Sequence, residues 1–301
     1  MMKCVVACLL LLISQAGCAG PGVHAVNISL VDLRSVPHTS PQPGHDPQEE
    51  SQLFYGEPVR ITAHANGWAR VEAVEQQEFT HHGRWEGYPG WVPDSALIKG
   101  ETWGPISIVT TEPWVTLWRS GMLIDSTTLR VPMGTRLSGK LIGGELWRIS
   151  LLDGKFAWIR KEEGMPLAPL GRLPTEIKRN YVVFNAQKWL GAPYLWGGRS
   201  PDGVDCSGLT NVLYRTIAMQ IPRDAHEQFL RAARVPSPQP GDLVFLSERD
   251  NPHKIVHVML YAGDGDVIEA PGTGGVVRRI SLDQRLAAAD RQVVSYGSYL
   301  P

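Results

Sequence analysis

The chain has 301 residues, of which 43% are hydrophobic and 20% are charged. At roughly 100 to 200 residues per domain, this length predicts two or three domains with buried cores. The 29 Lys and Arg residues balance the 30 Asp and Glu residues, so the charge balance excludes nucleic acid and anionic lipid as electrostatically attracted partners.

The N-terminus has the pattern of an export signal. A positive start at Lys3 precedes an apolar run over residues 5–13, and small residues surround Cys18, which predicts a cleaved signal peptide over residues 1–18. The apolar run is too short to span a bilayer. The same segment resembles a bacterial lipoprotein signal, in which Cys18 would be lipidated, although Gln15 stands where Leu is usual. We expect export to the periplasm or cell envelope, with membrane attachment only if Cys18 is lipidated.

Cysteine usage singles out one residue. Cys4 and Cys8 fall within the predicted signal and Cys18 at its end, so Cys206 is the single cysteine of the expected mature chain, and no disulfide can form within it. In an oxidising compartment, a solitary thiol is either buried and inert or retained for chemistry. Its neighbours decide between these alternatives.

Residues 26–168 consist of short β-type runs broken by Gly, Pro and Asp, without helical periodicity. A weak internal repeat divides this half of the chain, because the segment from Gly56 to Trp68 is echoed by the segment from Gly134 to Trp147. The similar spacing in both copies indicates one supersecondary unit that occurs twice.

The two copies resemble bacterial SH3 domains, one over residues 26–99 and one over residues 105–168. The resemblance implies two small β-barrels, with the repeated Trp residues more often in their cores than on a binding surface. A segment rich in Pro, His and Asp, residues 37–50, would form a long loop in the first barrel and is a candidate for shaping a site.

After Pro174 the sequence changes to a mixture of helices and strands. Thr175 is expected to cap a helix that ends before Gly191. A second helix is expected to begin at Cys206 and to bury one stripe. That stripe consists of Leu209, Val212, Leu213 and Ile217. Strands are expected over residues 242–246, 257–261 and 267–270, with a Gly-rich hairpin turn between the last two.

Cys206 lies at the loop-to-helix junction of residues 205–208. Backbone N–H groups and the helix dipole favour an anion at this position, which is expected to lower the pKa of the thiol from about 8.5. A nucleophilic thiol also needs an imidazole that accepts and delivers its proton. Cys206 is therefore the candidate nucleophile.

His257 is the candidate general base, because it opens a predicted strand that pairs with the strand carrying Glu269. A chain reversal about Gly263 would place His257 and Glu269 opposite each other, whereas a reversal one residue later would offset them. A carboxylate at this position would fix the imidazole tautomer and stabilise the imidazolium, as the third member of a catalytic triad does.

Residues 175–301 resemble the NlpC-type cell-wall cysteine peptidases through five motifs in that family's order. The motifs are residues 194–198, 205–208, 221–224, 241–245, and 257–258 through Glu269. The resemblance implies a reduced papain-like domain, over residues 172–301, that hydrolyses the bond between γ-D-glutamate and the diamino acid of peptidoglycan stems. Cys206, His257 and Glu269 would be its catalytic residues. Glu269 departs from the pattern, because the family more often has His there.

The combination with two SH3-like units resembles the γ-D-glutamyl-L-diamino acid endopeptidases, which trim free stem peptides. In that subgroup the first SH3 domain contacts the free amine of the N-terminal L-Ala, and the resemblance assigns this role to Glu57 and Tyr88. A carboxylate and a phenol suit an ammonium that a glycan-linked peptide lacks. The matching substrate-binding positions of the catalytic domain are Tyr194, Asp205, Ser207, Arg223 and Asp224.

The predicted architecture is an α+β papain-like cysteine peptidase domain preceded by two all-β SH3-like barrels, with stem peptides or muropeptides as substrates. No metal or cofactor is expected, because His81 and His82 lack a third ligand at a motif spacing. Two alternatives are a wall-lytic endopeptidase on intact peptidoglycan and a non-catalytic wall-binding protein. For Arg223 and Asp224, the alternative role is a structural ion pair or a helix cap.

Overall fold

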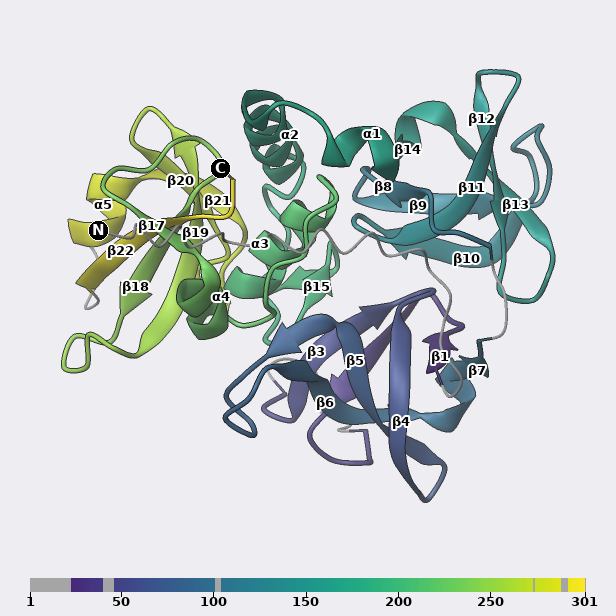
Figure 1. Ribbon diagram of the computed structural model, residues 1–301, viewed down its shortest axis with the longest axis horizontal. Helices are drawn as coiled ribbons and strands as arrows, with labels where there is room; N and C mark the ends of the chain where they lie inside the picture. Colours follow the sequence, from purple (N-terminus) through teal and green to yellow (C-terminus); the bar gives the residue numbers. More distant parts are fainter. Residues whose placement is uncertain (1–22, 40–45, 101–103, 273, 288–291, 301) are drawn as a thin grey trace, which may run out of the picture.

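The computed structural model describes residues 23–39, 46–100, 104–272, 274–287 and 292–300. The predicted signal peptide, with Cys18, lies outside these residues. Two all-β units and a mixed α and β unit pack around a common junction (Figure 1). Within the described part of the chain, no helix is long and apolar enough to cross a membrane.

The first unit is an antiparallel sheet of seven strands in the order β3-β2-β6-β5-β4-β1-β7. Its strands are β1 (Val23–Val26), β2 (Leu30–Arg34), β3 (Glu49–Phe54), β4 (Pro58–Ala65), β5 (Trp68–Glu78), β6 (Glu86–Pro93) and β7 (Leu97–Lys99), with a short 3-10 helix, Asp94–Ala96, before the last. A cluster of buried apolar side chains, including Leu33, Leu53 and Val71, forms its core.

The second unit is also a seven-stranded sheet, in the order β10-β9-β13-β12-β11-β8-β14. Its strands are β8 (Ile108–Thr110), β9 (Trp114–Trp118), β10 (Ser126–Pro132), β11 (Arg136–Ile142), β12 (Leu146–Ser150), β13 (Phe156–Arg160) and β14 (Gly164–Pro166), with a 3-10 helix, Lys161–Glu163, before the last. Tyr55 of the first unit packs into its core, where the Tyr55 hydroxyl accepts a hydrogen bond from the Leu152 backbone N–H at 2.7 Å.

The strand orders of the two units are identical when each unit is counted from its own first strand, which confirms the internal repeat. Gly56 and Gly134 both adopt positive φ, 81° and 84°, in the turn before the fourth strand of each unit, a conformation that glycine adopts without steric cost. Trp68 and Trp147 both lie on the fifth strand, where Trp147 is buried and Trp68 half-buried. The identification of the units as SH3 barrels stays a prediction.

The third unit has a six-stranded sheet in the order β17-β22-β18-β19-β20-β21 and a two-stranded sheet of β15 and β16. The strands of the unit are β15 (Arg199–Ser200), β16 (Gly203–Val204), β17 (Ala233–Val235), β18 (Leu243–Ser247), β19 (Ile255–Gly263), β20 (Asp266–Glu269), β21 (Arg278–Ser281) and β22 (Gln292–Ser298). Its helices are α1 (Leu167–Gly171), α2 (Thr175–Gln187), α3 (Cys206–Arg215), α4 (Ala225–Arg231) and α5 (Leu282–Ala287). Alternate residues of the sheet pack on opposite sides: Phe245 and Val258 join the core with α2 and α3, whereas Val244 and Met259 pack with Leu282 of α5.

The helix predictions are nearly all confirmed. α3 begins at Cys206, and the four predicted stripe residues are all fully buried. Thr175 is not the N-cap of α2 but its first helical residue, because Pro174 precedes the helix with an extended ψ of 146°. Proline is restricted to φ near −65° and favours this position at a helix boundary.

Buried ion pairs join the three units where they meet. Glu57 of the first unit accepts a hydrogen bond from Arg199 at 3.1 Å and forms an ion pair with Arg215 at 3.2 Å, and both arginines belong to the third unit. Arg215 also pairs with Glu75 at 2.9 Å, and Glu75 pairs with Arg136 of the second unit at 3.3 Å. Each buried charge therefore depends on partners from another unit.

Replacing Glu57 is expected to destabilise the whole assembly. Glu57→Ala leaves Arg199 and Arg215 buried without their shared carboxylate, a change that costs about 3–5 kcal/mol in comparable buried pairs. Urea unfolding followed by tryptophan fluorescence measures the loss, with the exposed Glu145→Ala as the matched control, for which a change within about 0.5 kcal/mol is expected. Equal stability of the two variants would contradict an inter-unit role for Glu57.

Candidate active site

Cys206 opens α3 and lines a cleft of about 560 Å³. The preceding residue, Asp205, is the helix N-cap, and its Oδ1 accepts the Gly208 backbone N–H at 2.6 Å. The other oxygen, Oδ2, accepts Arg223 Nη2 at 2.6 Å and the Gly197 backbone N–H at 3.0 Å. A cap and a buried ion pair thus hold the start of α3, and with it the direction in which Cys206 points.

The expected lowering of the thiol pKa is not found. Burial, followed by the nearby Asp205 carboxylate, raises the pKa of Cys206 to about 12, and hydrogen bonds from the backbone N–H groups of Val258 and Ser207 act in the opposite direction. Desolvation outweighs the helix N-terminus because a buried thiolate loses its hydration. The thiol is therefore neutral, and a nucleophilic role for Cys206 would require a base that removes its proton.

His257 is buried on β19 and is hydrogen-bonded to Glu269 of β20, with Nε2 and Oε2 2.7 Å apart. Leu260 pairs with Ile268, so the chain reverses one residue later than Gly263 and Glu269 is offset from His257 by two positions. The two side chains still meet, because diagonal neighbours on one face of a sheet are within reach of long side chains. Because the ionised Glu269 carboxylate can only accept, Nε2 carries the proton of this hydrogen bond, and Nδ1 is the basic nitrogen of the neutral ring.

The Glu269 carboxylate is fully buried and ionised. Burial raises its pKa, but the hydrogen bonds from His257, Arg285 and Arg278 outweigh burial and lower the pKa of Glu269 to about 2. Sequence reasoning missed both arginines. No sequence pattern singles out Arg278, which β21 places opposite Glu269 as an extension of the predicted hairpin.

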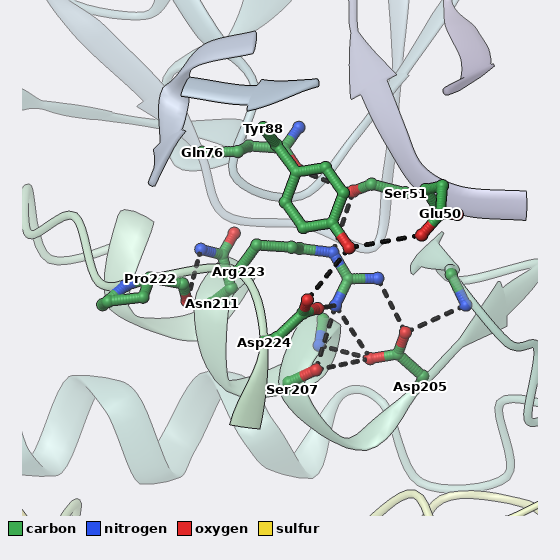
Figure 2. A network of polar contacts seen from close by, with 12 residues as sticks. Glu50, Ser51, Gln76, Tyr88, Asp205, Ser207, Asn211, Pro222, Arg223 and Asp224 are labelled. Atoms are coloured by element: carbon green, nitrogen blue, oxygen red, sulfur yellow. Dashed lines mark hydrogen bonds and ion pairs between the residues drawn. The ribbon is translucent and has the colours of Figure 1, made fainter. Parts of the chain in front are cut away.

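Side chains of the first and third units together form the cleft wall at the end nearest Tyr88. The Tyr88 hydroxyl donates to Asp224 Oδ2 at 2.9 Å and lies 3.4 Å from Glu50 Oε2 (Figure 2). Burial, with the two neighbouring carboxylates, raises the pKa of Tyr88 well above its usual value, so the hydroxyl stays protonated and donates. Burial also raises the pKa of Asp224 to about 7, a shift that water tempers because 38% of this side chain is exposed.

Most of the predicted substrate-binding residues do line this cleft. They are Tyr88, Tyr194, Asp205, Ser207 and Asp224. Glu50, at the end of the expected loop over residues 37–50, lines it as well and was missed as an individual residue, although the composition of the loop had marked the segment.

Glu57 and Arg223 are corrections to the sequence predictions. Glu57 does not reach the cleft, because Arg199 and Arg215 bind its carboxylate inside the junction of the units. Arg223 is fully buried, and its guanidinium contacts Asp205 and Ser51 rather than the open cleft, as Figure 2 shows. Its ion pair with Asp224 is long, 3.6 Å. Arg223 therefore positions Asp205, close to the structural role considered as its alternative.

Folding brings two carboxylates close to His82, which makes a set of three potential ligands. Among the described residues, Glu78, His82 and Glu86 place ligand atoms within 4.8 Å of one another. Glu78 and Glu86 are paired across the β5–β6 hairpin, and His82 and Arg84 are both hydrogen-bonded to Glu86. His82 and Arg84 thus bind Glu86, whereas Glu78 is bound by His81 at 3.0 Å, and neither Cys206 nor His257 belongs to the cluster.

The ionised state of Glu269 predicts a pH dependence of stability. Its pKa is about 2 in the folded protein and about 4.3 in an unfolded chain, so its contribution to stability is complete above about pH 5 and is lost as the pH falls from about 4.5 toward 2. The free energy of unfolding of the unmodified protein should exceed that of Glu269→Gln at neutral pH, with a gap that narrows below about pH 4.5. Urea titrations at stepped pH measure the gap, and a gap independent of pH would refute the ionised assignment.

Comparisons with known proteins agree with this geometry. Residues 191–293 match the model of the NlpC/P60 family. A Lysinibacillus sphaericus protein named dipeptidyl-peptidase 6 is 31% identical over 257 residues, covering 78% of this chain and 84% of the relative. A Bacillus cereus γ-D-glutamyl-L-lysine dipeptidyl-peptidase is 29% identical over 242 residues, covering 78% and 71%.

Similarity of structure extends over the whole assembly. The crystal structure of an NlpC/P60 family protein from Bacillus cereus superposes with a TM-score of 0.80 at 25% identity, covering 93% of this chain and 100% of that one. The matches include the all-β units as well as the part of the chain that carries Cys206 and His257. The chain belongs to the NlpC/P60 family of cell-wall peptidases and is a cysteine peptidase.

Proposed function

We propose that the protein is an exported endopeptidase that hydrolyses the γ-D-glutamyl to diamino acid bond of peptidoglycan stem peptides whose N-terminal L-Ala is free. The observation that carries the proposal is the acidic end of the cleft. There Glu50 of the first unit and Asp224 of the third flank the Tyr88 hydroxyl beside Cys206. The names of the relatives with γ-D-glutamyl-L-lysine specificity support the choice of bond.

The acidic end suits a primary ammonium. Two carboxylates and a phenolic oxygen would accept its three N–H groups, and charge-assisted hydrogen bonds of this kind contribute about 1.5–3 kcal/mol each. An acylated N-terminus has one N–H and no charge, so it would leave these carboxylates without a cation. The same groups therefore favour free peptides over peptides linked to glycan through an amide.

The catalytic steps assigned to the cleft are those of a thiol peptidase. His257 takes the Cys206 proton as the sulfur attacks the γ-glutamyl carbonyl carbon, and the backbone N–H of Cys206, with Tyr194 nearby, would stabilise the tetrahedral oxyanion. The His257 imidazolium then protonates the leaving amine, and water activated by the same imidazole hydrolyses the thioester. Glu269 holds the imidazole in the required tautomer through the 2.7 Å hydrogen bond.

Cleavage assays with and without an N-terminal acetyl group test the proposal. The protein should split free L-Ala-γ-D-Glu-diamino acid tripeptide into L-Ala-γ-D-Glu and the diamino acid, and the N-acetylated tripeptide should react at least about tenfold more slowly. Mass spectrometry identifies the products, and Cys206→Ala should abolish both reactions. Equal rates for the two substrates would favour the wall-lytic alternative, and no cleavage of either would favour the wall-binding alternative.

Neutralising the acidic end should remove the preference for a free amine. Glu50→Gln and Asp224→Asn are each expected to lower kcat/KM for the free tripeptide about 10- to 100-fold, because each removes one charge-assisted hydrogen bond. Cleavage of the acetylated tripeptide should change little. Glu162→Gln, an exposed carboxylate of the second unit, is the matched control. A uniform loss for both substrates would point to a folding defect instead of amine recognition.

A further inference from the structure

The carboxylate that contacts His257 has two more cationic partners. Glu269 Oε2 accepts Arg285 Nε at 2.8 Å as well as His257 Nε2 at 2.7 Å. Glu269 Oε1 accepts Arg278 Nε at 3.0 Å and Nη2 at 2.8 Å. Four donors from three side chains thus occupy both oxygens of one buried carboxylate.

The three partners of Glu269 come from three different elements. His257 lies on β19, Arg278 lies directly opposite Glu269 on β21, and Arg285 extends from α5. Arg285 is nearly buried and Arg278 is about half exposed. The carboxylate is consequently fixed from the sheet edge by one arginine and from the helix by the other.

The geometry limits how Glu269 can move. With Oε1 bound to Arg278, rotation of the carboxylate about its last side-chain bond would break two hydrogen bonds, and with Arg285 on Oε2 the same oxygen stays directed at His257. A glutamate has one more rotatable bond than an aspartate, so ordering its side chain costs more entropy. The hydrogen bonds from the two arginines offset this cost. A protonated glutamic acid would also donate instead of accept, which would release the imidazole tautomer.

We propose that Arg278 and Arg285 are positioning residues of the catalytic pair, which keep Glu269 ionised and directed at His257 Nε2. The proposal rests on the proposed catalytic roles of Cys206 and His257. The two arginines are the groups that allow a glutamate to act as the partner of His257.

The arginines also affect the basicity of His257. Two guanidinium charges within 3.0 Å of Glu269 partly neutralise the carboxylate, so removing either one strengthens the attraction of Glu269 for an imidazolium. Other ionisable groups of the same cleft come from the first unit, from α3 and the residues before it, from α4 and from the approach to β19. They are Glu50, His81, Tyr88, Tyr194, Asp205, Cys206, Asp224, His226, Glu227 and Lys254, and none of them is changed in the arginine variants below.

The test measures the pH profile of tripeptide hydrolysis in the full chain for Arg285→Gln and Arg278→Gln. We expect kcat to fall about tenfold, with KM within about twofold, because the imidazole is less well oriented. The acid-side midpoint of kcat/KM, where His257 becomes protonated, should shift upward by about half a pH unit or more. Arg285→Lys and Arg278→Lys keep the charge and should keep the midpoint of the unmodified protein.

Arg279→Gln is the matched control, since Arg279 is the neighbour of Arg278 on β21 but binds Asp266 at 2.8 Å instead of Glu269. It should retain both kcat and the pH midpoint. The positioning role would be overturned if the Gln variants kept the pH profile of the unmodified protein. It would also be overturned if their activity fell only in step with a lower unfolding temperature and the pH midpoint of kcat/KM did not move. If Cys206→Ala still hydrolyses the tripeptide, the proposed catalytic roles are overturned as well. If Cys206→Ala is inactive and the arginine variants keep the pH midpoint of the unmodified protein, only the positioning role is overturned.

Discussion

The structure depends most on the burial of charged side chains where its three units meet. Glu57, Arg199 and Arg215 are almost inaccessible to water, and an unpaired charge in such a place would cost several kcal/mol. The pairing is complete only when the first and third units are docked, since the carboxylate comes from one and the arginines from the other. Docking in this arrangement then places Glu50 and Tyr88 beside Asp224, so the same contacts that join the units also build the acidic end of the cleft.

Arginine–carboxylate pairs recur at each functional point of the cleft. Arg223 reaches Ser51 of the first unit at 2.8 Å and Asp205 at 2.6 Å, so it connects β3 to the cap of the helix that carries Cys206. The guanidinium is suited to this task because it is always charged and presents several N–H groups in a planar arrangement. Glu269 is paired in the same way, because two arginines compensate the charge of its carboxylate, which also contacts His257.

The neutral thiol and the ionised Glu269 have a common cause in burial. At Cys206, burial and the Asp205 carboxylate outweigh the charge of Arg223 and the backbone hydrogen bonds, so the proton stays on sulfur. Glu269 is fully buried but has three cationic or donating partners, so it loses its proton. In the mechanism that we propose, the carboxylate carries the charge before the reaction, and a proton moves from the Cys206 sulfur to the His257 imidazole during attack on the substrate.

Local patterns in the sequence determined the start of α3 at Cys206, its buried stripe, the hairpin that carries His257 and Glu269, and the duplication of the all-β units, because capping, periodicity and turn chemistry act over a few residues. Tertiary structure decided the partners of the charged residues. Glu57 and Arg223 stand in motifs that suggest substrate contacts, yet packing buries them, while Glu50 and Arg285 follow no motif and are brought to the site by docking and by α5. The pKa of Cys206 was likewise set by desolvation, which depends on every unit that covers the cleft and on no single segment of the chain.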